Sequence, residues 1–162
     1  MSEITITEIH RYPVKSMLGE TPSEVTVSER GIQGDRAWAT RDEVRGGIRG
    51  AKKLPQLMLF GARSVDGNTS EITAPDGSTC LTSSDEMNHW LSEKLDHSVT
   101  LWPLLPPDNL EHYRRGAPDS EDFEQELREI FGRTHDEPLP DLSAFAEVIE
   151  LESPPGTYIY AF

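Results

Sequence analysis

Two short segments near the start of the chain place a cation beside residues that can help to hold an anion. In residues 12–16, Tyr-Pro-Val-Lys-Ser, Lys15 stands next to the hydroxyl of Ser16. In residues 31–38, Arg36 follows an aspartate and precedes an alanine-tryptophan pair. An ammonium group is a point charge and a guanidinium is a planar fork of donors, and both bind phosphate or carboxylate groups. The two segments therefore predict an anion clamp, and the alternative is a pair of solvated side chains at strand ends.

The order and spacing of the two segments resemble the N-terminal β-barrel domain of MOSC proteins. This is the molybdenum-cofactor sulfurase C-terminal superfamily, which includes the mitochondrial amidoxime-reducing component. Residues 51–57 resemble a third segment of the family. In MOSC proteins of the amidoxime-reducing kind, the Lys and Ser of the first motif and the Arg of the second contact the pterin and phosphate of the molybdenum cofactor. The resemblance thus implies that Lys15, Ser16 and Arg36 bind molybdopterin.

The family's catalytic cysteine has no counterpart in this sequence. That cysteine belongs to the C-terminal MOSC domain and ligates molybdenum through a soft thiolate. The single cysteine here, Cys80, lies in a different segment. In relatives the chain would continue past a segment like residues 154–158 into the catalytic half, so we expect a fragment or a naturally short form. The resemblance implies the non-catalytic part of a molybdenum-dependent oxidoreductase or sulfur-carrier protein, with an incomplete cofactor site and no catalytic residue.

A second group of cations lies in residues 41–53, where several glycines are interleaved with basic residues. Each interior glycine costs a helix about 1 kcal/mol relative to alanine, so the stretch predicts a mobile basic loop. Arg49, Lys52 and Lys53 can close over a phosphate from such a loop, and a solvated basic loop is an equal alternative. Asp35 is expected to be a structural partner of Arg36, because a neighbouring cation favours the ionised carboxylate.

The sequence does not indicate a metal site, a nucleotide-binding or hydrolase motif, or a reactive cysteine. The five histidines show no close metal-ligand spacing, so we assign no metal site. No Gly-x-Ser-x-Gly motif, P-loop or dinucleotide fingerprint is present. Cys80 has no basic residue near it in the sequence and is expected to be a small core residue.

The net charge of −14 argues against general nucleic-acid binding, because a phosphate backbone would be repelled. Residues 1–63 carry net +2 and residues 64–162 carry net −16, so an anion is expected at the N-terminal part. The acidic remainder predicts a solvated surface. With no long apolar run, no signal peptide and one cysteine, we expect a cytoplasmic protein that does not enter membranes.

Short alternating segments predict the strands that would position the motifs. Residues 4–12, 24–28 and 36–40 read as three strands with short connections, which is typical of an antiparallel barrel or sandwich. Asp76-Gly77 lies between two extended runs and predicts a hairpin. Residues 99–102 predict one more strand.

Two helices are expected. Residues 85–95 carry apolar residues spaced by four, after a capping box at 83–86. Residues 121–131 form the second helix, with Ser120 as N-cap and a glycine stop. A short helical piece is also expected at 142–148.

We therefore predict a mainly β, α+β fold: an antiparallel MOSC-N-like β-barrel with two short helices. The barrel domain spans 1–105, and an acidic, Pro-rich extension at 106–162 leads toward an absent MOSC domain. Its predicted function is to contact the pterin phosphate and shape the substrate entrance. The alternative is a non-catalytic interaction domain that pairs with a separate MOSC or redox protein through its acidic face and its apolar residues 158–162. A complete small enzyme lacks a convincing nucleophile or general base.

Overall fold

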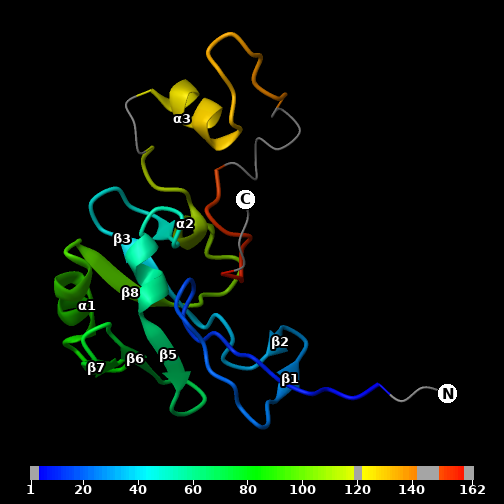
Figure 1. Ribbon diagram of the computed structural model, residues 1–162, viewed down its shortest axis with the longest axis vertical. Coiled ribbons are helices and arrows are strands. Elements are labelled where there is room, and N and C mark those ends of the chain that lie inside the picture. The colour runs from blue at the N-terminus through cyan, green and yellow to red at the C-terminus, as the bar shows by residue number, and fades with distance from the viewer. Residues whose placement is uncertain (1–3, 119–121, 142–149, 159–162) are drawn as a thin grey trace.

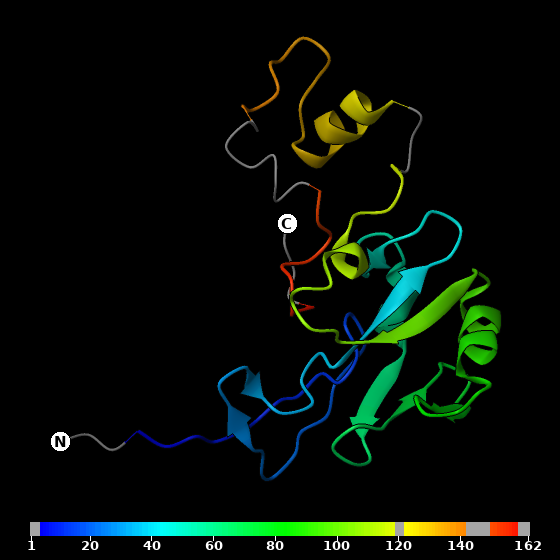
Figure 2. The same ribbon diagram turned by 180° about the vertical axis from the view of Figure 1, so that it is seen from behind.

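The computed structural model describes residues 4–118, 122–141 and 150–158. Two three-stranded antiparallel sheets and helix α1 (Met87–Leu95) pack into one body, and a two-stranded ribbon lies to one side of it (Figures 1 and 2). Helix α3 (Phe123–Ile130) lies at one end of the molecule. The fold is α+β, as the sequence predicts. No helix in the described ranges is long and apolar enough to cross a membrane.

The central sheet has the order β4-β3-β8. Strand β3 (Trp38–Asp42) pairs along its length with β8 (Val99–Pro103) on one side and with β4 (Ile48–Arg49) on the other. Val99 and Leu101 are buried and alternate with partly exposed residues, so one face of β8 lies against the core. This sheet joins the early part of the chain to residues sixty positions later.

The second sheet has the order β5-β6-β7 and contains the predicted hairpin. Strand β6 (Ser70–Thr73) pairs with β5 (Gly61–Ser64) and with β7 (Thr79–Leu81). The turn between β6 and β7 is closed by the amide of Ser78 donating to Asp76 Oδ1 at 2.9 Å. The aspartate-glycine signal is thereby confirmed.

The third sheet is a two-stranded ribbon of β1 (Val27–Ser28) and β2 (Gly31–Ile32). Its short strands fall within or just after the predicted second strand. A 3-10 helix, η1 (Pro55–Leu59), connects the central sheet to β5. Its Leu57 is fully buried, whereas Met58 and Leu59 are 58% and 64% exposed.

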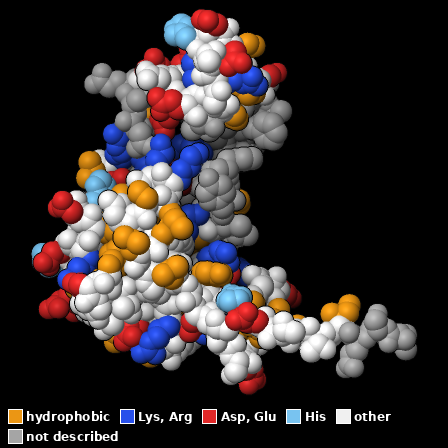
Figure 3. Space-filling model, in the orientation of Figure 1, with side chains coloured by type: hydrophobic (Ala, Val, Ile, Leu, Met, Phe, Trp, Pro, Cys, Tyr) orange, Lys and Arg blue, Asp and Glu red, His pale blue; other side chains and the backbone are white. Residues whose placement is uncertain are grey.

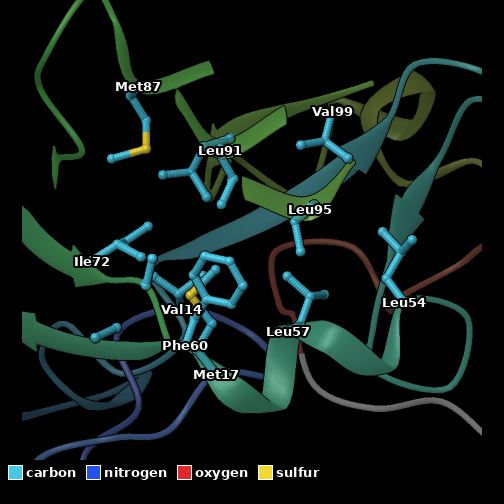
Figure 4. Close-up of a cluster of buried hydrophobic side chains, with 13 residues drawn as sticks. Val14, Met17, Leu54, Leu57, Phe60, Ile72, Met87, Leu91, Leu95 and Val99 are labelled. Atoms are coloured by element: carbon cyan, nitrogen blue, oxygen red, sulfur yellow. The ribbon is translucent and has the colours of Figure 1, made fainter. Parts of the chain in front are cut away.

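The main hydrophobic core lies between α1, the second sheet and η1 (Figure 4). Met87, Leu91 and Leu95 occupy one face of α1 at the predicted spacing of four, and all three are buried. Figure 4 shows their side chains in one cluster with Ile72 of β6 and Leu57 of η1. The burial of this apolar stripe holds α1 in place, because the helix is too short to be stable alone.

A smaller core joins the central sheet to later segments. Ala39 and Ile48 pack there with two tyrosines, Tyr113 and Tyr158, which are 0% and 1% exposed. Tyr113 ends helix α2 (Leu110–Tyr113), which is capped by the side chain of Asn109. Only four residues long, α2 has too few turns to show a helical period, so the sequence pattern does not predict it.

Two loops cross so closely that only glycine fits at the crossing. A Cβ added to Gly47 would overlap the backbone of Gly116, and a Cβ on Gly116 would overlap the backbone of Gly46. Arg49 donates to the carbonyl of Ala117 at 3.2 Å beside the crossing. Residues 116–117 are therefore fixed to the turn between β3 and β4.

The predicted first strand, residues 4–12, is wrong as a strand. Residues 4–10 adopt no regular secondary structure, and Ile4 and Ile6 are 96% and 78% exposed on an arm that points away from the body (Figure 1). A single antiparallel bridge joins Arg11 to Glu20. Continuing that register would place Pro22 opposite Ile9, and a proline has no N–H with which to extend the ladder.

The helix ends also differ from their predicted signals. Helix α1 begins after Glu86 without a side-chain cap, so the predicted capping box is wrong. Helix α3 is capped by Asp122, which accepts from the amides of Glu124 and Gln125, rather than by Ser120. Ser120 and the expected helical piece at 142–148 lie outside the described residues.

Candidate functional site

The two cationic motifs lie side by side, joined through their backbones. The amide of Arg36 donates to the carbonyl of Tyr12 at 2.7 Å, and the amide of Lys15 donates to the carbonyl of Trp38 at 2.9 Å. The amide of Tyr12 donates to Asp35 Oδ1 at 2.8 Å. These bonds place side chains that are twenty residues apart in the sequence around one point.

A cavity of about 310 Å³ opens at this point. Arg36 supplies its charged group, and Ser16 supplies an aliphatic hydroxyl. The rest of its wall is aromatic or apolar and consists of Tyr12, Met17, Leu18, Ala51 and Met58.

The guanidinium of Arg36 is held in place by two neighbours. It forms an ion pair with Asp35, and its centre lies 5.4 Å from the ring centroid of Tyr12. Asp35 thus acts as a structural partner, as the sequence predicts, because it binds both the guanidinium and the Tyr12 amide. A cation over an aromatic ring retains N–H groups at its edge that can donate to an anion.

Ser16 links the first motif to the third. Its Oγ accepts from the amide of Ala51 at 3.0 Å, which leaves the hydroxyl hydrogen for a ligand. Gly50 makes the approach possible, because a Cβ there would lie 3.0 Å from Ser16 Oγ and 3.4 Å from Lys15 Cε.

Lys15 is not among the residues that line the cavity, although its neighbour Ser16 is. Its side chain is buried, and Nζ donates to the carbonyl of Tyr158 at 3.1 Å. Burial lowers the pKa of Lys15; the negative charge of Glu152 opposes this shift and the positive charge of Arg36 adds to it. The structure therefore brings Ser16 and Arg36 together and separates the ammonium of Lys15 from them.

The second group of cations does not form one loop. Arg49 lies in β4 and is 4% exposed, with its guanidinium 3.6 Å from the carboxylate of Asp42, so the prediction of a mobile loop is wrong at this residue. Lys53 pairs with Glu126 of α3 at 3.2 Å. Lys52 is exposed. An anion-contacting role for these three residues remains a prediction, and the fixed position of Arg49 comes from tertiary pairing that glycine content cannot reveal.

Sequence reasoning missed a buried polar cluster around Asp42. Asp42 Oδ1 accepts from the amides of Val44 and Arg45 and lies 3.1 Å from Nε2 of His97. An aspartate that precedes a glycine-containing turn is a signal for such amide contacts. The partnership with His97 joins residues far apart in sequence and leaves no local signal.

Metal-ligating residues do not gather elsewhere in the described part of the chain. No three His, Cys, Asp or Glu residues there are grouped so that they could hold a metal ion. Cys80 lies in β7 and packs against the main hydrophobic core. Its partly buried position agrees with the predicted role as a small core residue.

A comparison with protein families identifies the first part of the chain. The family model described as MOSC N-terminal beta barrel domain matches residues 3–93, more than half of the 162 residues. The chain belongs to the MOSC N-terminal β-barrel domain family. No curated protein matches the chain. Both cationic motifs lie within the matched part of this MOSC N-terminal domain, whereas β8 lies beyond it and still completes the central sheet.

The backbone of Arg36 gives a prediction for stability in this MOSC N-terminal domain. Its φ of 50° is in the left-handed region, which costs a residue with a side chain about 1 kcal/mol or more. Arg36→Gly is therefore expected to be more stable than Arg36→Ala by about 1 kcal/mol in urea unfolding. At Arg63, in strand β5, the order of the two variants should reverse. A glycine variant at position 36 that is less stable than the alanine variant would contradict the left-handed conformation.

Proposed function

We propose that this domain contacts the pterin phosphate of the molybdenum cofactor and shapes the entrance to its site. One observation carries the proposal: Ser16 and Arg36, from separate motifs, line the same cavity, and each has a left-handed backbone, with φ of 67° and 50°. Such conformations cost free energy and cluster at ligand sites. The association of the MOSC family with the molybdenum cofactor supports this choice of ligand.

The chemistry of the cavity suits the phosphate end of such a ligand. Arg36 offers a charged donor edge and Ser16 offers a hydroxyl, the groups that bind phosphate oxygens. Met17, Leu18 and Met58 offer apolar surface for the edge of a planar ring. A volume of about 310 Å³ is near the lower limit for small-molecule sites, so the cavity would hold part of the cofactor.

The residues present do not suit the metal end of the cofactor. Molybdenum favours a thiolate ligand, and Cys80 lies in β7, packed against the main core rather than lining the cavity. In a complete site the cofactor would supply redox chemistry, and this chain would supply binding contacts alone. We therefore propose that the domain is inactive by itself and needs a second domain or protein to complete the site.

Binding of isolated molybdopterin tests the proposal. The wild-type protein is expected to bind it weakly, and Arg36→Ala should weaken binding at least tenfold, since a hydrogen bond to a charged group contributes about 1.5–3 kcal/mol. Fluorescence titration under anaerobic conditions gives the Kd. Arg63→Ala is the matched control, because Arg63 pairs with Glu71 on the surface and does not line the cavity. No binding, or binding unchanged in a Lys15→Ala, Arg36→Ala double variant, would remove the proposal.

Exposed apolar residues at the rim of the cavity and next to it favour a second candidate function, that of a non-catalytic interaction domain for a MOSC or redox protein. Figure 3 shows hydrophobic side chains over the centre of one face, and Leu18, Met58 and Leu59 are all more than half exposed. Tyr158, the first of the apolar residues 158–162, is 1% exposed and therefore cannot contact a partner in this conformation. Light scattering after size exclusion tests both candidates: a stable dimer would favour the interaction domain, and a clean monomer without pterin absorbance would weaken both.

A further inference from the structure

Residues 150–158, which we term the covering segment, are packed against the body of the domain. The amide of Arg115 donates to the carbonyl of Glu150 at 2.8 Å, and the amide of Glu152 donates to the carbonyl of Tyr113 at 2.8 Å. Ser153 is 0% exposed. The segment is thus held along its length by backbone hydrogen bonds and burial.

Tyr158 anchors the covering segment beside the candidate site. Its hydroxyl donates to the carbonyl of Pro103 at 2.7 Å and lies 2.5 Å from Nε2 of His112. The ring is buried in the smaller core, which includes Tyr113. Because the side chain is fixed in this way, its backbone carbonyl is fixed as well, and this is the carbonyl that accepts from Lys15 Nζ.

The covering segment gives Lys15 what an anion would otherwise supply. Tyr158 contributes an acceptor oxygen at 3.1 Å, and Glu152 contributes a negative charge that favours the ammonium form. Lys15 and Arg36 still influence one another, since the charge of Arg36 disfavours the ammonium form of Lys15. A negatively charged group bound to both cations would therefore relieve their repulsion. It would also replace the acceptor oxygen of Tyr158 and the negative charge of Glu152.

We propose that the covering segment is a built-in competitor for the phosphate group: it occupies Lys15 and must move away before Lys15 can join Ser16 and Arg36 on a ligand. The inference rests on the proposed function, because it takes the anion at this site to be a phosphate. Binding is then linked to opening of the segment, and the observed affinity is reduced by the fraction of molecules in which the segment is closed.

Chemical labelling of Lys15 tests whether the segment covers it. Acetic anhydride acetylates accessible amines, and peptide mass spectrometry gives the rate at each lysine. Acetylation of Lys15 is expected to be slow in the wild type and at least tenfold faster in Tyr158→Ala, whereas exposed Lys52 should be labelled equally in both. Equal rates at Lys15 in the two proteins would overturn the inference.

Inorganic phosphate provides the second measurement and excludes simple unfolding as the cause of labelling. In Tyr158→Ala, phosphate should bind at least tenfold more tightly than in the wild type and should protect Lys15 from acetylation, which an unfolded chain would not show. Glu152→Gln keeps the shape of the side chain and is expected to tighten phosphate binding by a few fold. If both Tyr158→Ala and Glu152→Gln bind phosphate no more tightly than the wild type, the inference is overturned.

The two proposals fail in different ways. If phosphate binds and protects Lys15 in Tyr158→Ala but molybdopterin binds to neither protein, the proposed function is wrong and the competing role of the segment stands. If molybdopterin binds equally well to both proteins and Lys15 remains protected in both, the competing role is wrong and the cofactor-binding function stands.

Discussion

Replacing Asp42 with alanine is expected to lower the free energy of unfolding by about 3–5 kcal/mol, the usual result of removing one partner from a buried ion pair. Asp42 is 4% exposed and faces the guanidinium of Arg49, which is equally buried. The same carboxylate lies 3.1 Å from Nε2 of His97 and accepts from two amides of the turn that follows β3. The substitution therefore removes a charge and the oxygen that accepts two amide hydrogen bonds.

Two further variants separate these contributions. Asp42→Asn keeps an acceptor oxygen for the amides but loses the charge. Its free energy of unfolding should therefore lie between those of the wild type and Asp42→Ala. Glu43→Ala removes the neighbouring acid, whose pair with Arg41 at 3.5 Å is partly exposed, and should cost less than about 1 kcal/mol. Urea unfolding at pH 7 measures all three. An Asp42→Ala loss as small as that of Glu43→Ala would show that the buried pair does not stabilise the fold.

The pH dependence of the free energy of unfolding is a second test of the contacts around Asp42. Burial by itself would raise the pKa of Asp42, but hydrogen bonds from the amides of Arg45 and Val44, together with His97, outweigh burial and hold that pKa below its usual value. The stabilisation is then fully present above the unfolded pKa of about 3.9 and is lost as the pH falls through the lower folded value. Below about pH 4 the wild type should lose stability more steeply than Asp42→Asn.

Leu91→Ala is expected to lower the free energy of unfolding by about 2–5 kcal/mol. Leu91 is 0% exposed, and Figure 4 shows its side chain at the centre of the core that α1 shares with Ile72 and Leu57. Truncation there loses apolar burial and leaves a cavity between elements from three parts of the chain. The expected result is a shift of the urea midpoint with the slope m unchanged.

Leu59→Ala is the matched control for the core substitution. Leu59 is 64% exposed on η1, so the same truncation should change stability by less than about 0.5 kcal/mol. If the two substitutions lower the free energy of unfolding equally, burial of Leu91 does not stabilise the packing of α1.

Local patterns in the sequence predict the elements that depend on near neighbours. The spacing of Met87, Leu91 and Leu95 predicts the buried face of α1, because one helix brings those side chains together without help from the rest of the chain. The turn at 76–77 predicts its hairpin for the same reason. Residues 4–9 show the limit of such prediction. Their alternation fits a strand, but a strand needs a partner, and Pro22 interrupts the pairing that the Arg11–Glu20 bridge would continue.

The candidate site shows the same division. Arg36 and Ser16 are found from their motifs, and the structure places both in one cavity. Lys15 belongs to the same motif, yet its ammonium faces Tyr158, and Arg49 is buried against Asp42. Both side chains also contact distant segments, Lys15 at Tyr158 and Arg49 at the carbonyl of Ala117, and neighbouring residues do not encode those contacts.

The hydrogen bond from Lys15 to Tyr158 joins residues 143 positions apart, which has a consequence for the order of folding. The β6–β7 hairpin and α1 are built from near neighbours and can form early, on a microsecond scale. Closing a loop that spans most of the chain carries a larger entropic cost and must wait until nearly all of the chain is available. The central sheet does not need the Lys15–Tyr158 contact, so we expect Lys15 to stay accessible until residues 150–158 pack against the body.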